Sequence, residues 1–190
     1  MKRILVILVS CLMLIVLSGC RQTEGGSIEV FQLEEKEKKL LQKVGTHPHE
    51  VMRFNYNNIP IEYKYIRVWV EYYEKEELVT DNLLGVRWQV EDEEQIICSF
   101  RSNKDNLIVT INGSSSTSSE INTVDSIWTT IANEQKIQVI DDRAFILGIR
   151  VINKGVSFEP FSDAAFVEND LSNVLKNDYV YVIKGAFEKE

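Results

Sequence analysis

Few residues in this chain have the side-chain chemistry of a catalytic or metal site. His47 and His49 are the only histidines, and they flank Pro48. An H-x-H pair can bind Zn²⁺ or Cu²⁺, but no cysteine lies nearby, so only scattered carboxylates could complete the coordination shell. We therefore interpret the pair as part of a solvated linker and expect no metal and no cofactor.

A nucleophile activated by a base is also not expected. Cys98 stands between Ile96 and Phe100 in an alternating pattern, which places its thiol among apolar side chains on one face of a strand. A reactive thiolate needs partial exposure and a positive neighbour, so we expect Cys98 to be buried and unreactive. No Gly-x-Ser-x-Gly sequence occurs, and no carboxylate pair stands out among the 29 acids. The chain is interpreted as a non-enzyme, with a cell-envelope hydrolase that uses carboxylates as the alternative.

A cluster of aromatic and charged residues is the best candidate for binding. Trp69, Arg67, Tyr65 and Tyr73 lie within one β-rich stretch, and Arg67, Trp69 and Tyr73 share a face by alternation. An aromatic ring beside a charge suits a sugar or the surface of a partner protein. The alternative is that a terminal helix covers Trp69 and makes this face a core.

A fourth kind of chemistry, lipid attachment, is indicated at the N-terminus. Lys2 and Arg3 precede an apolar run over residues 4–17 that is too short to cross a bilayer as a helix. We interpret residues 1–19 as a signal peptide. An ordinary secreted protein and an uncleaved anchor helix are the alternatives.

The residues Leu17, Ser18, Gly19 and Cys20 resemble the lipobox of bacterial lipoproteins. In that family the cysteine thiol is diacylglycerylated and the chain is cut just before it. The resemblance implies that Cys20 carries a diacylglyceryl anchor, and that the mature protein stays at the extracytoplasmic face of the cell membrane without a transmembrane helix. The wider pattern, including residues 66–73 and 77–79, loosely resembles uncharacterised lipoproteins of bacillus-type bacteria, which implies no activity or site residues.

Composition narrows the partners and the fold. The net charge of −8 becomes −10 once Lys2 and Arg3 leave with the signal peptide. Nucleic acid and direct electrostatic binding to anionic lipid both need a basic patch, so neither is expected. The mature chain suits one domain, and it must fold without an internal disulfide because Cys98 is its only cysteine besides Cys20.

The segments before the strands are predicted as a tether and a helix. Residues 21–27 are polar and contain Gly25 and Gly26, which is typical of a flexible tether, and we expect the tether to cover residues 20–30. Residues 31–44 place their apolar side chains on one side of a helix, and we expect that side to dock on the domain.

From residue 51 onward the apolar period is that of strands. Strands are predicted over 51–56, 61–73, 84–90, 96–100, 107–111, 136–140, 143–152 and 179–187. A bulge or a strong bend is expected near Tyr65, a flexible loop over 113–119, a short helix or irregular turn over 121–131, and a helix over 167–176. Runs of strands without intervening helices predict an antiparallel β-sandwich or open barrel of about eight strands, with one N-terminal and one short C-terminal peripheral helix, as a single domain over 31–190.

We therefore expect a binding or protein-interaction module at the cell envelope. Its partner would be an envelope protein or a carbohydrate, reached from a membrane anchor on Cys20. A purely structural envelope component is a further alternative.

Overall fold

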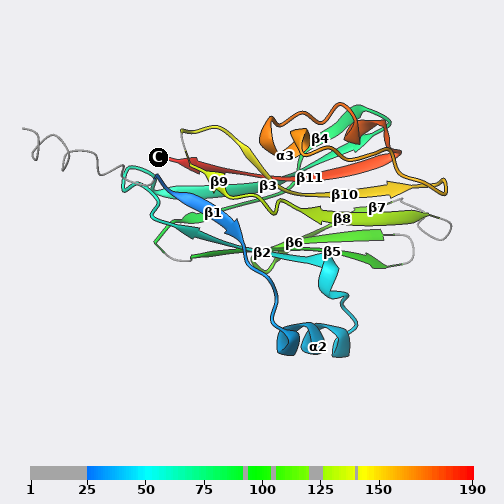
Figure 1. The fold of residues 1–190 in the computed structure, drawn as a ribbon, viewed down its shortest axis with the longest axis horizontal. Coiled ribbons are helices and arrows are strands. Elements are labelled where there is room, and N and C mark those ends of the chain that lie inside the picture. Colours follow the sequence, from blue (N-terminus) through cyan, green and yellow to red (C-terminus); the bar gives the residue numbers. More distant parts are fainter. Residues whose placement is uncertain (1–24, 92–93, 104–105, 120–125, 140) are drawn as a thin grey trace, which may run out of the picture.

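The computed structural model describes residues 25–91, 94–103, 106–119, 126–139 and 141–190. The predicted signal peptide, the residues that resemble a lipobox, including Cys20, and the first part of the stretch 121–131 lie outside these ranges. The described residues form two antiparallel sheets that pack face to face (Figure 1). The sandwich expected from the sequence is confirmed, with eleven described strands in place of about eight.

The six-stranded sheet has the order β7-β6-β5-β2-β1-β9. Its strands are β1 (Ser27–Val30), β2 (Val51–Asn57), β5 (Gln95–Asn103), β6 (Asn106–Ile111), β7 (Ser114–Ser119) and β9 (Ile137–Gln138). The meander β5-β6-β7 follows the chain order, whereas β1 lies between β2 and β9 and pairs with both.

The five-stranded sheet has the order β4-β3-β11-β10-β8. Its strands are β3 (Tyr65–Glu74), β4 (Glu77–Gln89), β8 (Ile127–Ala132), β10 (Phe145–Asn153) and β11 (Tyr179–Glu188). β11 lies at the centre of this sheet, because it pairs with β3 on one side and with β10 on the other.

The main core fills the space between the two sheets. Alternation turns Ile66, Val68 and Val70 of β3 inward, where they meet Phe54 of β2 and Phe100 of β5. All five side chains are fully buried. This inward set is the one that the sequence predicted, and it leaves the opposite face of β3 outside the sandwich.

A second, smaller core covers half of the outer face of the five-stranded sheet. The segment between β10 and β11 carries α3 (Ala164–Val167) and the short helix η2 (Val174–Lys176). Its Ala165, Leu171 and Val174 pack on Ile149 of β10 and Val182 of β11. The C-terminal helix predicted over 167–176 is therefore wrong in its bounds. The described chain is helical before this range, in α3, and at its end, in η2, but not between them.

The buried face predicted for β10 is also corrected. The alternation assigned Phe145, Leu147, Ile149 and Val151 to one face. The register shifts between Ile146 and Gly148, which sends Leu147 into the main core and Ile149 and Val151 into the second core. Both faces of β10 are buried as a result.

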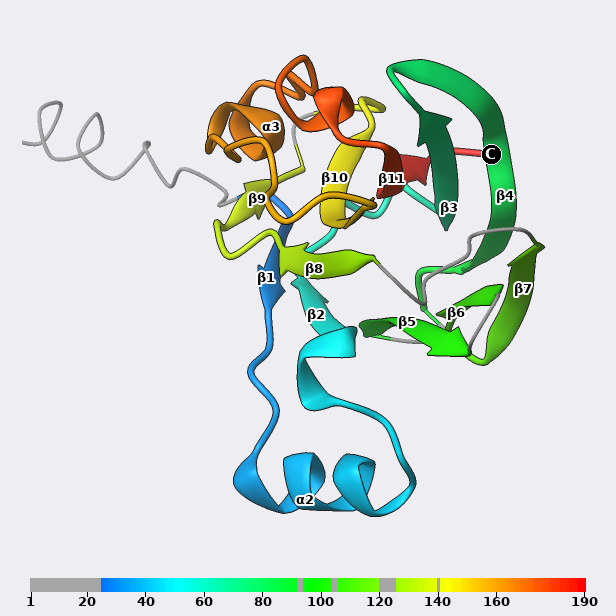
Figure 2. The same cartoon turned by 90° about the vertical axis from the view of Figure 1, so that its right-hand side faces the viewer.

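The predicted N-terminal helix exists but does not dock on the domain. It is α2 (Glu35–Lys43), shorter than 31–44, and it is followed by the short helix η1 (Pro48–Glu50). It projects from the side of the six-stranded sheet, opposite α3 (Figures 1 and 2). Residues 27–30 of the predicted tether form β1, so the sheet begins inside that segment.

Two predicted irregular stretches are strands. The Ser/Thr-rich segment expected as a loop forms β7, which pairs with β6 at the edge of the sheet. The stretch expected as a helix or turn forms β8 over its described part, where it pairs with β10. Backbone hydrogen bonds to one neighbour are enough for an edge strand, so its side chains need not be apolar.

The predicted bulge near Tyr65 is wrong. The change of phase there marks the start of β3, since residues 61–64 form a turn before it. The register shifts of β3 lie further along, between Val70 and Tyr73, where β4 pairs irregularly.

Candidate binding face

The four residues predicted for binding lie together on the outer face of β3. We call Tyr65, Arg67, Trp69, Glu71 and Tyr73 the β3 row. Arg67 is exposed, the three aromatic side chains are half-buried, and Glu71 is buried. The alternation of side chains along an extended strand brings all five to one face.

Guanidinium groups rest on two of the rings. Arg67 Cζ lies 5.0 Å from the ring centroid of Trp69, and Arg87 Cζ lies 3.6 Å from that of Tyr65. Arg87 faces the row from β4, and its Nε donates to Glu188 Oε2 at 2.6 Å. Cation–π contacts of this kind fix the orientation of the rings, and the ring surface on which a sugar would stack is already shared with an arginine.

Glu71 is the centre of a hydrogen-bond network within the row. Its carboxylate accepts hydrogen bonds from Tyr73 Oη at 2.6 Å, from Lys184 Nζ at 2.8 Å and from Trp69 Nε1 at 3.3 Å. Burial raises the pKa of Glu71, but the hydrogen bonds from Lys184 and Tyr73 and the charge of Lys184 outweigh it and hold the pKa below its usual value. Burial and the contact with Glu71 raise the pKa of Tyr73. Because Trp69 and Tyr73 both donate to this carboxylate, Glu71 fixes the positions of their rings.

Within the described part of the chain, no terminal helix covers Trp69. α2 lies on the opposite side of the sandwich, α3 contacts mainly β10, and Trp69 belongs to neither core. Tyr73, at the end of the row, packs beside the second core. The β3 row therefore begins where the cover formed by α3 and η2 ends.

The two histidines lie apart from this face. His47 and His49 stack on each other at 5.3 Å, and His49 stacks on Trp128 at 5.3 Å. Both are exposed and flank Pro48 in the turn that leads into β2. No cluster of three or more His, Cys, Asp or Glu side chains suited to a metal ion occurs in the described part of the chain.

Cys98 is buried in the main core, as the alternation predicted. Burial without any charged partner raises the pKa of its thiol to about 12. The thiolate required of a nucleophile is thus disfavoured at neutral pH.

No pattern in the sequence predicted that an arginine would be buried inside the sandwich. Arg150 of β10 is 0% exposed. It donates from Nη1 to Thr130 Oγ1 at 2.7 Å and from Nη2 to Ser102 Oγ at 3.0 Å, and its Cζ lies 3.7 Å from the ring centroid of Trp128. Burial lowers the pKa of Arg150 to about 10, against the opposing charge of Glu50. These contacts join the two sheets.

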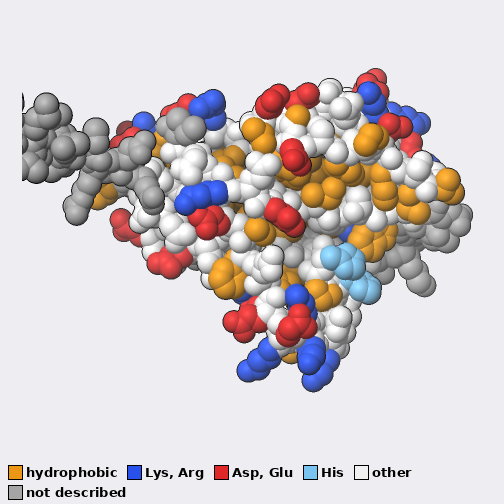
Figure 3. Space-filling view, viewed as in Figure 1, with side chains coloured by type: hydrophobic (Ala, Val, Ile, Leu, Met, Phe, Trp, Pro, Cys, Tyr) orange, Lys and Arg blue, Asp and Glu red, His pale blue; other side chains and the backbone are white. Residues whose placement is uncertain are grey.

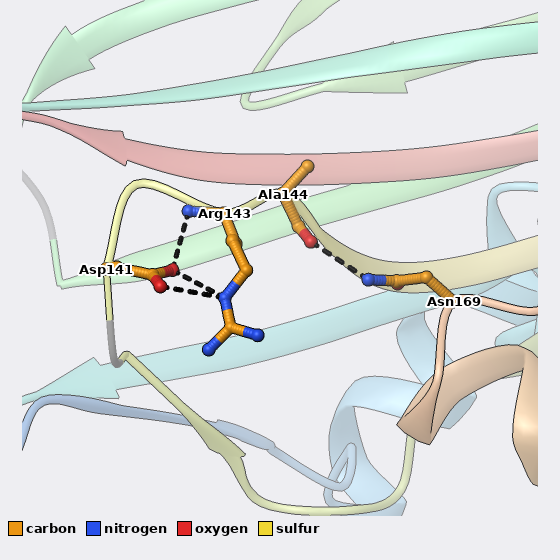
Figure 4. Close-up of polar contacts among 4 residues, drawn as sticks. All are labelled: Asp141, Arg143, Ala144 and Asn169. Carbon is orange, nitrogen blue, oxygen red and sulfur yellow. Dashed lines mark hydrogen bonds and ion pairs between the residues drawn. The ribbon is translucent and has the colours of Figure 1, made fainter.

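A surface hollow of about 240 Å³, lined by both polar and apolar side chains, was also missed. It lies between β9, the turn into β10, and α3. At its rim Arg143 Nε donates to both carboxylate oxygens of Asp141 at 2.8 Å, and Asn169 Nδ2 donates to the carbonyl of Ala144 at 3.2 Å (Figure 4). The hydrogen bonds from Arg143 lower the pKa of Asp141. Asp141 and Arg143 are thus paired with each other, and Lys136, which also lines the hollow, is paired with Glu29 at 2.9 Å.

The comparisons with known proteins identify one family. The model of the YgaN domain family matches residues 27–187, from the start of β1 into β11. Neither a curated protein nor a solved structure was found to match. Within the described ranges, none of the helices has the length and apolar character needed to cross a membrane.

Proposed function

The chain belongs to the YgaN domain family, and from this premise we propose that it is a protein-interaction module anchored at the extracytoplasmic face of the cell membrane by a diacylglyceryl group on Cys20. The β3 row is its binding face. The observation that carries the proposal is that aromatic and cationic side chains remain open on one half of a sheet face whose other half is covered.

The composition of the β3 row favours a protein partner over a carbohydrate. Trp, Tyr and Arg are the residues that dominate the energetics of protein interfaces. The rings of Trp69 and Tyr65 each carry a guanidinium, which reduces the surface available for stacking a sugar. The network around Glu71 holds the rings in place before binding, which lowers the entropy lost on association.

Charge indicates the chemistry of the partner. Arg87 pairs with Glu188 and Lys184 pairs with Glu71, whereas Arg67 is exposed and forms no ion pair within the described residues. A guanidinium offers a planar fork that matches a carboxylate. The partner surface is therefore expected to bring an Asp or Glu to Arg67, with apolar atoms against Trp69.

The lipobox supports the anchor. Residues 20–26 lie between Cys20 and the start of β1, and a fully extended segment of that length spans at most about 24 Å. The domain would thus stand close to the lipid surface. The mass of the N-terminal peptide of the mature protein tests this part: a Cys20 with a diacylglyceryl mass is expected, and a free thiol or an intact Met1 would exclude the anchor.

Crosslinking on intact cells tests the binding face. Gln89 of β4 pairs with Tyr65 of β3. A photo-crosslinking residue at Gln89 should therefore yield a discrete adduct with an envelope protein. Arg67→Glu should abolish that adduct, because it reverses the charge offered to the partner. The matched control is the same crosslinker at Ile97, an exposed position on β5 in the other sheet.

An adduct from Ile97 of the same size, or an adduct from Gln89 that survives Arg67→Glu and Trp69→Ala together, would show that the β3 row is not the binding face. Both variants should keep the wild-type unfolding midpoint to within a small shift, since neither side chain lies in a core.

A further inference from the structure

Helix α2 stands apart from the rest of the fold. None of its nine residues is buried, and its main contact is with η1. An ion pair between Glu37 Oε1 and Arg53 Nη1, at 2.7 Å, ties it to β2. A helix of this length is marginal in water without a surface to pack on, and the sandwich does not supply one.

Four exposed side chains form a stripe along one side of this helix and its C-cap: Lys36, Leu40, Lys43 and Val44. Their spacing, i, i+4, i+7 and i+8, places them on one helical face. Leu40 is 63% and Val44 62% exposed, the two largest apolar exposures of the projection. We call these residues the α2 stripe; Figure 3 shows basic side chains (blue) at the outer end of the same projection, with acidic side chains (red) beside them.

We propose that the α2 stripe seats on the anionic lipid surface of the membrane that holds Cys20. Leu40 and Val44 enter the boundary between headgroups and acyl chains, and the lysines beside them contact lipid phosphates, as in interfacial amphipathic helices. The inference rests on the proposed lipid anchor, which keeps the helix near the membrane.

The distribution of charge favours this surface. The chain as a whole is acidic, at −8. Helix α2 and its N-cap Glu34 nevertheless contain four lysines against three glutamates, of which Glu35 is paired with Lys38 and Glu37 with Arg53. Lys36, Lys39 and Lys43 form no ion pair within the described residues. An anionic surface attracts this projection and repels the acidic remainder of the domain. The basic patch that overall composition did not indicate is therefore local.

The path of the chain supports the same seat. β1 leads from the segment after Cys20 towards α2, and only residues 31–34 separate the strand from the helix. The lipid-bearing residue and the α2 stripe thus lie within one short N-terminal segment, so both can touch one membrane plane.

The seat sets the orientation of the domain. α2 projects on the side of the six-stranded sheet, whereas the β3 row lies on the outer face of the five-stranded sheet (Figures 1 and 2). Docking of the α2 stripe would turn the six-stranded sheet towards the lipid and leave the β3 row facing away from it, open to a partner.

Fluorescence from a single label tests the seat. In the full mature chain with its anchor, reconstituted into vesicles, Leu40→Cys provides one reactive thiol, because Cys98 is buried and Cys20 is acylated. An environment-sensitive dye at position 40 should shift to shorter wavelength on vesicles that contain phosphatidylglycerol, and much less on phosphatidylcholine alone or in high salt. The control is the dye at Val156→Cys, which is 98% exposed after β10 and should not respond.

Charge reversal gives a second measurement. The variant Lys36→Glu, Lys39→Glu and Lys43→Glu should lower the lipid-inserted fraction of the label at least about tenfold. The matched control carries the same change of charge at Lys75, Lys154 and Lys176, which are exposed lysines outside α2, and should keep the wild-type response.

Three results would overturn the seat. These are a label at position 40 that stays in water on anionic vesicles, an equal shift on phosphatidylcholine, or a shift without lipid that grows with protein concentration and so indicates a second copy on the stripe. Flotation of the same vesicles separates the two proposals. Chain that floats with an unshifted label retains the anchor but not the seat, and chain that fails to float lacks the anchor.

Discussion

Glu71 decides how the β3 row is ordered. Its carboxylate is the common acceptor for an indole, a phenol and an ammonium group, which come from two strands. If Glu71 were removed, the donors on Trp69, Tyr73 and Lys184 would lose this acceptor. The rings of Trp69 and Tyr73 would also lose the contact that fixes their orientation.

Glu71→Gln should make the domain less sensitive to acid. The folded-state pKa of Glu71 lies below its ordinary 4.5, so the charged carboxylate adds stability above that pH and loses it as the pH falls through the folded pKa. The variant should be less stable than the wild type at pH 7, and its loss between pH 7 and pH 4 should be smaller. Urea titrations followed by tryptophan fluorescence give both free energies of unfolding.

Glu168→Gln, at an exposed acid beyond α3, is the control and should follow the wild-type pH profile. An unchanged acid limb in Glu71→Gln would mean that the network around Glu71 does not form in solution.

The sequence predicted the face of these residues but not their contacts. Alternation assigned Arg67, Trp69 and Tyr73 to one side because neighbouring side chains of a strand point in opposite directions. Lys184 meets Glu71 only because β11 pairs with β3, a pairing between distant parts of the chain. No local pattern carries that information.

At the scale of elements, the segment between β10 and β11 that covers the sheet is fixed by the side-chain amide of Asn177 as well as by the second core. Asn177 is 1% exposed, and its Oδ1 accepts from Asn153 Nδ2 at 2.8 Å and from the backbone N–H of Glu159 at 3.0 Å. Its Nδ2 donates to the carbonyl of Val174 at 2.7 Å. The amide thus joins the beginning and the end of the cover to the end of β10.

Asn177→Ala should loosen the cover while leaving the sandwich folded. It leaves a buried N–H and a buried carbonyl without their partner, which costs about 1–3 kcal/mol. Limited proteolysis should then cut within residues 154–178 faster than in the wild type. Asn173→Ala, at an exposed position of the same segment, should not change the rate, and equal rates for the two variants would contradict the latch role of Asn177.

The elements that sequence reasoning misjudged share a cause. β7 contains only Ser and Thr, so its composition was that of a loop, and it is a strand because β6 offers it an unpaired edge. α2 has the pattern of a helix that docks on its own domain, yet none of its residues is buried, and its main contact within the described chain is with η1. In both cases the neighbour, and not the segment, determines the outcome.

At the scale of the whole molecule, Arg150 joins the two sheets through their interior. Its guanidinium reaches Ser102 on β5 of one sheet and Thr130 on β8 of the other. The fold class followed from runs of alternating residues, but this bridge did not, because an arginine between Ile149 and Val151 gives no sign that its side chain points into a core.

Arg150→Ala should lower the free energy of unfolding by about 3 kcal/mol, since it opens a cavity in the main core and removes the donor of two half-buried hydroxyl groups. Arg150→Met, which keeps most of the volume and removes the buried charge, should lose much less. Urea unfolding measures both, with Arg143→Ala on the surface as control. A loss below about 1 kcal/mol for Arg150→Ala would exclude the bridging role.

The central position of β11 in its sheet has a consequence for biosynthesis. β3 is synthesised early, but the edge of β3 that pairs with β11 has no partner until residues 179–188 have been synthesised. The five-stranded sheet therefore cannot assemble in the order in which the ribosome makes its strands. The five-stranded sheet would therefore stay incomplete until β11 has been synthesised. A premature stop codon anywhere before β11 should then yield a product for the quality-control proteases instead of a shortened domain.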